Sequence, residues 1–350
     1  MKMFICLSFA IFLGIIGLIM WAGYPWSLSA KQHHPEIITV EPDGMVSFEE
    51  NPSVIKIMTW NLGFLYGEGS EGPGYEFREK KIYEEKLSQL AQFIEEWNPD
   101  VICLQEIDFD SFRSHGMNQA QYIAKKAGYP YVAEALSWDA HYIPFPYWPI
   151  SRHFARVKSG GAIISKYPLM DHEVNLLAKP ISQPWWYNIF YLHRYFQKVT
   201  IEMGDKKFKI INLHLEAFDK KERQDQIELL SQKVLKENID FVTGDFNMLM
   251  SSATKRSKFY NDDNYENDFS YEKALKMNLS EVIPDDIYAK NESLYFTYPA
   301  SHPDRRLDYI FYKPELKMMK AEVVPSALSD HLPLRASFQI DSPKFNLYSQ

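Results

Sequence analysis

The chain has 350 residues, of which 46% are hydrophobic and 24% are charged. This composition is that of a globular protein with one large domain or two small ones, and it excludes a largely disordered chain. The net charge of −8 excludes a broad basic surface that would grip nucleic acid non-specifically, although a local basic patch stays open. Because the two cysteines, Cys6 and Cys103, both lie in apolar runs, neither a disulfide framework nor a thiolate metal site is expected.

The N-terminal segment 1–30 contains an uncharged apolar run from Phe4 to Trp21. The run is long enough to cross the hydrocarbon core of a bilayer, and it exceeds the roughly 7–15 apolar residues of a cleaved signal peptide. We therefore expect a membrane anchor over residues 4–21, with a cleaved signal-like segment as the alternative. Lys2 and the amino terminus favour a cytoplasmic N-terminal end, which places the rest of the chain on the periplasmic or extracellular side.

Residues 31–52 mix prolines with charged residues and show no sustained hydrophobic period, so they are expected to form a linker. The catalytic domain is expected over residues 53–341, followed by a short tail at 342–350.

Within this domain, short apolar runs alternate with segments of helical period. The runs predict strands at 54–61, 100–105, 161–165, 197–203, 207–215, 239–245, 306–312 and 334–340. The helical pattern predicts helices at 78–97, 117–127 and 219–237. Residues 203–206 predict a hairpin turn between two of the strands. This order favours a single α/β domain in which two packed sheets are covered by helices.

Polar side chains recur where the apolar runs end. The set consists of Asn61, Glu106, His214, Asp245, Asn247, Asp308, Asp330 and His331. A single acidic residue after a strand is usually a cap or turn residue, and a single histidine in an apolar run is usually a satisfied core residue. A whole series of such residues at strand ends is hard to explain by turn chemistry alone, and it predicts a shared site.

The residue types suit the hydrolysis of a phosphate ester. The carboxylates of Glu106 and Asp330 are ligands for a hard cation such as Mg²⁺, with Mn²⁺ as an alternative. Asp245 would polarise an attacking water and Asn247 would hydrogen-bond a non-bridging oxygen, while a histidine held by a carboxylate would donate a proton. The mixture of many carboxylates with few histidines disfavours a structural zinc site.

Seven motifs resemble, in order and spacing, those of the endonuclease/exonuclease/phosphatase superfamily. They are TWN at 59–61, LQE at 104–106, GGAIISKYP at 160–168, LHLEA at 213–217, GDFN at 244–247, RLDYIF at 306–311 and SDHLPL at 329–334. Each motif is weak, but the joint pattern over 59–334 is specific. The resemblance implies a four-layer α/β/β/α sandwich of two mixed sheets flanked by helices, with the active site at the sheet edges.

The resemblance also implies roles for individual residues. Glu106 is similar to the principal metal-binding glutamate, assisted by Asn61, and Asp330 to a second metal or water ligand. Asp245 and Asn247 are similar to the pair that orients the nucleophile and the phosphate. His331 resembles the catalytic histidine and Asp308 its orienting carboxylate.

His214 places the chain closer to the deoxyribonuclease and sphingomyelinase branch than to the abasic-site endonucleases, which have a tyrosine and asparagine motif there. In YPYVAEALS, Glu134 stands where the deoxyribonuclease branch has a carboxylate facing this histidine. The resemblance therefore implies a catalytic Glu134–His214 pair, with an ordinary surface charge at Glu134 as the alternative.

Two segments, 138–156 and 181–196, are crowded with tryptophan, tyrosine, phenylalanine and proline. Such side chains favour a membrane interface, which together with the anchor suggests a lipid-linked phosphate ester. The alternative is that the two segments pack on each other as a small core. The acidic run 261–268 lacks the glycine and terminal glutamate of a calcium loop and is expected to be a solvated loop.

The sequence thus predicts a membrane-anchored, metal-dependent phosphoesterase that hydrolyses a phosphodiester by direct attack of water. Its substrate would be a lipid or a nucleic acid, and no obligate protein partner is inferred. A metal-dependent nuclease acting on DNA or RNA is the nearest alternative. A catalytically silent binding module of the same fold is a third, although such a module would be expected to have lost some of the polar groups.

Overall fold

A computed structural model describes residues 2–23, 30–44, 49–67, 79–261 and 263–340. The tail expected at 342–350 lies outside these residues. The described chain forms two seven-stranded mixed sheets. The first has the order β1 (Gln32–His33), β7 (Leu169–Leu176), β8 (Tyr195–Met203), β9 (Lys206–His214), β10 (Phe241–Asp245), β12 (Asp308–Tyr312) and β11 (Ser280–Glu281). The second has the order β13 (Lys317–Val323), β14 (Leu334–Gln339), β3 (Val54–Asn61), β4 (Val101–Asp108), β6 (Ala155–Ser165), β5 (Tyr131–Ile143) and β2 (Ile37–Thr39).

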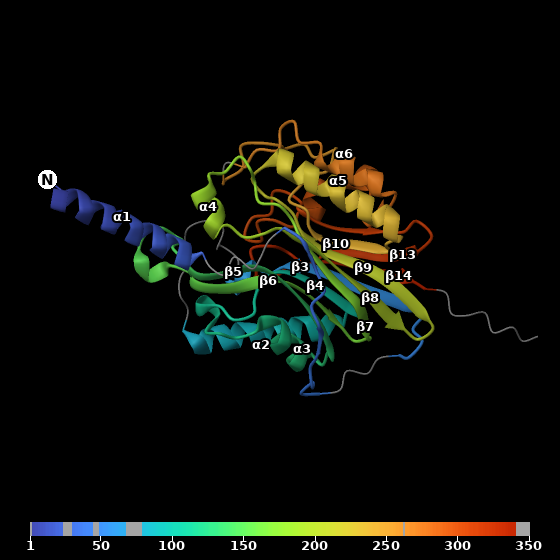
Figure 1. Ribbon diagram of the computed structural model, residues 1–350. Coiled ribbons are helices and arrows are strands. Elements are labelled where there is room, and N and C mark those ends of the chain that lie inside the picture. The colour runs from blue at the N-terminus through green and yellow to red at the C-terminus, as the bar shows by residue number, and fades with distance from the viewer. Residues whose placement is uncertain (1, 24–29, 45–48, 68–78, 262, 341–350) are drawn as a thin grey trace, which may run out of the picture.

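Helices cover the outer face of each sheet (Figure 1). The second sheet is covered by α2 (Lys80–Trp97) and α3 (Gln119–Ala127), and the first by α5 (Lys220–Glu237) and α6 (Ser270–Ala274). Two further short helices are α4 (Trp185–Phe190) and α7 (Asp285–Tyr288). The 3₁₀ turns are η1 (Gly63–Leu65), η2 (Phe112–Ser114), η3 (Ile150–Arg152), η4 (Leu275–Met277) and η5 (Glu292–Tyr295). The predicted four-layer sandwich is confirmed.

The helix boundaries follow from local capping. The side chain of Asn118 accepts a hydrogen bond from the Gln121 amide at the start of α3, and Asp219 accepts one from the Glu222 amide at the start of α5. Each of these caps satisfies a backbone donor that the first helical turn leaves free. The predicted helices at 117–127 and 219–237 are therefore confirmed to within two residues at their N-terminal ends.

The predicted strands occur, and several are longer than expected. The hairpin turn at 203–206 joins β8 to β9, with Met203 paired to Lys206. Within the domain, sequence reasoning missed β5, β7, β13 and the two-residue strand β11. The charged residues of β7 and the largely exposed pattern of the edge strand β13 give no continuous apolar run, and β5 runs on into an aromatic segment.

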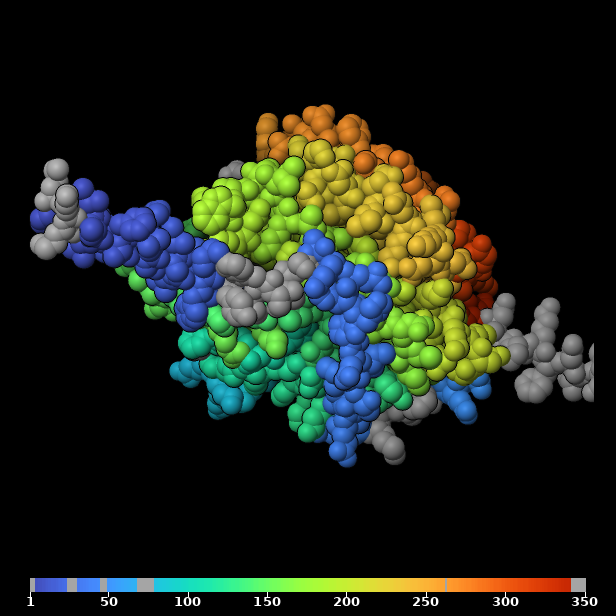
Figure 2. Space-filling model, viewed as in Figure 1, coloured from blue at the N-terminus to red at the C-terminus, as the bar shows by residue number. Residues whose placement is uncertain are grey.

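Residues 31–52 do not behave as a simple linker, and this expectation is corrected. Gln32 and His33 pair with β7 in one sheet, and residues 37–39 pair with β5 in the other. Residues 31–44 of this segment run across the surface of the sandwich (Figure 2). Pairings of two or three residues leave no periodic pattern, which is why the sequence did not reveal them.

Helix α1 (Lys2–Ala22) projects from the sandwich (Figure 1). Over Phe4–Ala22 it is long and apolar enough to cross a membrane. Its inner end touches the domain at β5, where His141 Nδ1 lies 3.2 Å from the Trp21 carbonyl oxygen and the two rings are 5.2 Å apart.

Candidate active site

Three ionisable residues lie side by side because of strand register. His214 and Asp245 are opposite each other on the parallel strands β9 and β10. Asp245 is also opposite Asp308 on the antiparallel strand β12. Residues opposite each other on neighbouring strands lie within side-chain reach, so these pairings gather two carboxylates and an imidazole at one edge of the sheet.

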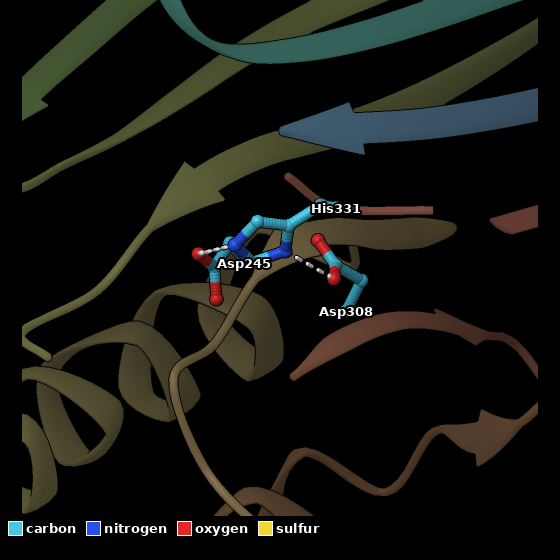
Figure 3. A group of neighbouring side chains, drawn as sticks. All are labelled: Asp245, Asp308 and His331. Carbon is cyan, nitrogen blue, oxygen red and sulfur yellow. Dashed lines mark hydrogen bonds and ion pairs between the residues drawn. The ribbon is translucent and has the colours of Figure 1, made fainter. Parts of the chain in front are cut away.

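His331 completes this cluster from the loop before β14. Its Nδ1 lies 2.8 Å from Asp308 Oδ2, and its Nε2 lies 3.9 Å from Asp245 Oδ2. Figure 3 shows the imidazole ring between the two carboxylates. Trp60 Nε1 donates to the His331 carbonyl oxygen at 2.8 Å, and the ring centroid of Tyr298 is 4.6 Å from that of His331. The Trp60 hydrogen bond therefore fixes the backbone of His331, and the contact with Tyr298 fixes its ring.

The pKa values of the two histidines of the site are shifted in opposite directions. Burial disfavours charge on His331, but the Asp308 carboxylate outweighs burial and, with Asp245 and Asp330, raises the pKa of His331 to about 10. Burial and the positive charge of Arg194 hold the pKa of His214 well below its usual value. His331 is therefore an imidazolium at neutral pH, whereas His214 is neutral.

Asp245 is held by donors on both oxygens. Asn61 Nδ2 donates to its Oδ2 at 3.0 Å, and the Asn247 amide donates to its Oδ1 at 2.9 Å. Burial and the neighbouring Asp308 nevertheless raise the pKa of Asp245 above that of an ordinary carboxyl. Asp245 can consequently exchange a proton near neutral pH, as a general base must.

Glu106 reaches the cluster from the other sheet. It has a left-handed backbone, with φ of 50°, where the pairing of β4 with β6 shifts register between Leu104 and Ile107. Such a bulge redirects a side chain from its regular alternation. Glu106 Oε1 lies 3.7 Å from His214 Nε2, and the side chain is 28% exposed. It thus links the buried cluster to solvent.

The other two predicted metal or phosphate groups lie close by. Asn61 Oδ1 accepts from the Gly63 amide at 3.0 Å, so both ends of its amide are engaged. This geometry suits a residue that orients Asp245 better than a metal ligand. Asp330 Oδ1 accepts from Ser329 Oγ at 3.2 Å and lies so near Gly63 that a methyl group there would collide with it.

Asn247 has a left-handed backbone with φ of 50°, and its Nδ2 donates to the Leu215 carbonyl oxygen at 3.0 Å. This bond ties the loop after β10 to the loop after β9.

The expected Glu134–His214 pair is not formed, and this prediction is corrected. Glu134 Oε1 accepts hydrogen bonds from Asn118 Nδ2 at 2.8 Å and from Gln121 Nε2 at 2.9 Å, both at the start of α3. Side chains alternate along a strand, and Glu134 is on the face of β5 that α3 covers, whereas Ala133 faces the space between the sheets. Glu134 is therefore turned away from His214.

Arg194 occupies the place expected for Glu134. Its Nη1 hydrogen-bonds His214 Nε2, its Nη2 donates to Tyr191 Oη at 3.2 Å, and its Nε lies 3.6 Å from Glu216 Oε2. Sequence reasoning missed this buried cation because it lies within an aromatic segment. No local pattern marks it, because its place beside His214 follows from the pairing of Tyr195 with His214, which only the structure shows.

A polar bridge between the sheets was also missed. Gln105 Nε2 donates to Asn212 Oδ1 at 2.6 Å and to Thr59 Oγ1 at 3.1 Å, and Asn212 Nδ2 donates to the Leu104 carbonyl oxygen at 3.0 Å. Gln105 and Asn212 are fully buried and lie next to Glu106 and His214 in the two sheets. The bridge fixes the two halves of the site relative to each other.

The donor set fits a divalent cation. One carboxylate oxygen each of Asp245 and Asp308 and one ring nitrogen of His331 lie within 4.8 Å of one another, and because His331 is protonated the two carboxylates are the groups that would attract a cation. Asp308 Oδ1 is buried, and among the described residues it has no hydrogen-bond partner. Two buried carboxylates with an unsatisfied oxygen favour a neighbouring positive charge.

A two-sheet sandwich with a carboxylate and histidine centre at its edge is the architecture that these observations define. The chain belongs to the Endonuclease/Exonuclease/phosphatase family, whose model matches residues 58–331. The family is largely hydrolytic, and its members act on phosphate esters such as nucleic acids. No curated protein sequence matches the chain.

Several solved structures share the fold. An endonuclease/exonuclease/phosphatase from Beutenbergia cavernae is 18% identical with a TM-score of 0.60, covering 83% of this chain and 72% of that one. A mannosyl-6-phosphatase from Bacteroides thetaiotaomicron is 15% identical with a TM-score of 0.54, covering 82% and 100%. The catalytic domain of human Nocturnin with bound sulfate is 20% identical with a TM-score of 0.51, covering 87% and 97%. At these sequence identities, the similarity shows that the chain shares the fold of these proteins.

Proposed function

We propose that the protein is a membrane-anchored, divalent-metal-dependent phosphoesterase that hydrolyses a phosphodiester by direct attack of water. The observation that carries the proposal is the convergence of Glu106, His214, Asp245, Asp308 and His331, which come from both sheets, at one sheet edge. A phosphate ester is the substrate class for which this combination of acid, base and cation site is suited.

The cation would be held by Glu106 beside the buried cluster, with Asn61 and Asp330 as further candidate ligands and with Mg²⁺ favoured over Mn²⁺. When bound, it neutralises charge on the phosphate. The protonated Nε2 of His331 is a hydrogen-bond donor, so His331 is a better acid than ligand. Asp330 remains a candidate for a second metal or water ligand.

The acid and base are assigned from their positions. Asp245 would accept the proton of the attacking water, because Asn61 and the Asn247 amide fix its carboxylate beside the proposed cation and 3.9 Å from His331. His331, held in register by Asp308, would stabilise the developing negative charge and donate a proton to the leaving oxygen.

The phosphoryl oxygens would be held by donors that surround the cluster. Arg194 offers a buried guanidinium beside neutral His214, and Asn247 offers its side chain from the loop after β10. A guanidinium binds phosphate through paired hydrogen bonds, so Arg194 would orient the ester for attack.

We further propose that α1 anchors the domain in a membrane with the N-terminal end in the cytoplasm. The apolar span Phe4–Ala22 supports this placement, and Lys2 at its start favours the orientation. The catalytic domain would then lie on the periplasmic or extracellular side. A lipid-linked ester is favoured over nucleic acid, because the net charge is −8.

The test uses the full chain in lipid nanodiscs with Mg²⁺, offered labelled plasmid, RNA and mixed lipid vesicles in parallel. Cleavage of vesicle lipids supports the proposal, whereas nucleic-acid cleavage with vesicles untouched would identify a nuclease. His331→Ala should abolish the activity. If wild type hydrolyses none of these substrates faster than His331→Ala, the chain is a binding module and the proposal fails.

A further inference from the structure

Glu106 and Arg194, which border the catalytic cluster, line a cavity of about 390 Å³ formed mostly by the two aromatic segments 138–156 and 181–196. Most of its lining side chains are aromatic, and among the described residues the charged ones are Glu106 and Arg194. The cavity therefore has a polar end at the proposed metal and phosphate site and an apolar body extending away from it. A ligand that fills it would carry one anionic group attached to an apolar group.

The walls of this cavity are fixed before any ligand binds. Trp138 Nε1 donates to the Phe190 carbonyl oxygen at 2.9 Å, which joins the two aromatic segments. The guanidinium of Arg113 lies 3.6 Å from the ring centroid of Phe64 and 4.5 Å from that of Phe154. Arg113 is itself paired with buried Asp108 at 2.9 Å. The segments thus pack on each other, as one alternative expected, and still leave a preformed cavity between them.

The cavity lies next to the inner end of the anchor helix. Trp138 and Tyr191 line it, and they also line a second cavity of about 490 Å³ whose other wall includes Met20 and Gly23 at the end of α1. Figure 1 shows α4 beside this end of α1. Trp138 and Tyr191 therefore lie between the catalytic cavity and the inner end of α1.

The rim of the cavity is exposed and aromatic. Tyr147 is 71% exposed and Trp186 is 52% exposed, and both line the cavity. Their neighbours Trp148 and Trp185 are 78% and 66% exposed. Amphipathic rings of this kind are stable at the level of lipid headgroups, and a cluster of them on a water-facing surface is unfavourable. The rim is thus suited to contact with the bilayer surface.

We propose that this cavity binds the hydrocarbon part of a membrane lipid whose phosphate ester lies at Glu106 and Arg194. The inference rests on the proposed function, since the same site would hydrolyse that ester. One cation beside an apolar cavity matches one phosphate attached to a hydrocarbon chain. A nucleic-acid strand would require further cations along the groove to follow its backbone, and Arg194 is the one cation that the described part of the chain contributes to the cavity lining.

The experiment measures the binding of alkylphosphonates, which carry a phosphorus–carbon bond and are not phosphate esters. The full chain in nanodiscs is titrated with methyl, butyl and octyl phosphonate in the presence of Mg²⁺, against empty nanodiscs. Affinity should rise by about two- to fourfold for each methylene that enters the cavity. Equal affinity for all three chains would overturn the proposal.

Two neighbouring tryptophans on α4 provide a matched pair of variants. Trp186→Ala removes a cavity wall, whereas Trp185→Ala removes a ring that lines the second cavity instead. Because both rings are largely exposed, neither change should unfold the domain. Trp186→Ala should flatten the dependence on chain length, as should Phe218→Ala, whose exposed ring also lines the cavity. Identical behaviour of Trp185→Ala and Trp186→Ala would contradict the proposed site.

Failure of this inference is distinguishable from failure of the proposed function. Hydrolysis of the methyl and octyl esters of 4-nitrophenyl phosphate at the same kcat/KM would leave the phosphoesterase in place and remove the lipid cavity. Chain-length-dependent phosphonate binding without hydrolysis of either ester would leave the cavity and remove the catalytic role. Displacement of octyl phosphonate by a single-stranded oligonucleotide, but not by short-chain phospholipid, would assign the aromatic rings to base stacking and overturn the proposal.

Discussion

His331 and Asp308 form the central ion pair of the site, with Nδ1 of the imidazole 2.8 Å from Oδ2 of the carboxylate. Asp308 is fully buried, so its charge acts on the imidazole with little screening by water. The pair keeps His331 protonated and leaves its Nε2 directed toward Asp245. The imidazole ring of His331 thus lies between Asp308 on its Nδ1 side and Asp245 on its Nε2 side (Figure 3).

Replacing Asp308 with asparagine tests this relationship. Asp308→Asn keeps the shape of the side chain but removes the charge that raises the pKa of His331. We expect kcat for a phosphodiester to fall by roughly 10²–10⁴-fold, the range of one general acid. Asp304→Asn changes a carboxylate in the loop before β12 that pairs with Lys255 and Arg305, and it should leave kcat unchanged. A normal kcat in Asp308→Asn would show that the imidazolium is not required.

Arg194 should act on substrate binding. Arg194→Met removes the guanidinium that hydrogen-bonds His214 and is placed to hold the phosphate. A charge-assisted hydrogen bond contributes about 1.5–3 kcal/mol, so KM should rise by roughly 10- to 150-fold with a smaller change in kcat. Arg156→Met, which breaks an exposed pair with Asp110, is the control and should leave KM unchanged. An unchanged KM in Arg194→Met would remove Arg194 from the site.

The edge location of the site was predictable from sequence, because polar residues end apolar runs and the ends of neighbouring strands meet. The register that places His214, Asp245 and Asp308 opposite one another is a long-range property that no local pattern contains. The prediction that Glu134 pairs with His214 was wrong for a related reason. A strand alternates its faces with a period of two, so one residue decides whether a side chain faces the other sheet or a helix. Arg194 was missed because its role depends on its pairing partner.

The polar bridge between the sheets should contribute to stability. Asn212→Leu leaves Gln105 Nε2 without its shortest hydrogen bond and removes the donor to the Leu104 carbonyl oxygen. A buried polar group left unsatisfied costs about 1–3 kcal/mol, so the free energy of unfolding should fall by that amount. Chemical denaturation in detergent micelles measures it, with the exposed Asn291→Leu as control. Equal stability of the two variants would mean that the bridge is energetically neutral.

The lowered pKa of Glu173, which lies away from the site, makes its contribution to stability depend on pH. Burial opposes its ionisation, but hydrogen bonds from Lys233, Asn175 and Lys198 outweigh burial and lower its pKa to about 2. A carboxyl whose pKa is lowered on folding stabilises the protein above its unfolded pKa, and that contribution is lost as the pH falls toward its folded pKa.

Glu173→Gln should therefore be less stable than wild type by roughly 2–3 kcal/mol at pH 7, and the difference should shrink as the pH falls from about 4.5 toward 2. Thermal unfolding at several pH values measures this. Glu202→Gln, which breaks a more exposed pair with Lys207, should change stability little at any pH. A difference for Glu173→Gln that is constant between pH 3 and pH 7 would contradict the assigned ionisation.

Metal dependence of hydrolysis tests the central claim most directly. The rate of bis(4-nitrophenyl) phosphate hydrolysis by the full chain in nanodiscs is measured after treatment with EDTA and again after Mg²⁺ or Mn²⁺ is returned, for wild type and for Glu106→Gln. We expect EDTA to abolish the wild-type rate, the cation to restore it, and Glu106→Gln to need a higher cation concentration for a lower rate. A wild-type rate that survives EDTA, or a Glu106→Gln variant with the wild-type cation dependence, would contradict a metal-dependent centre at Glu106.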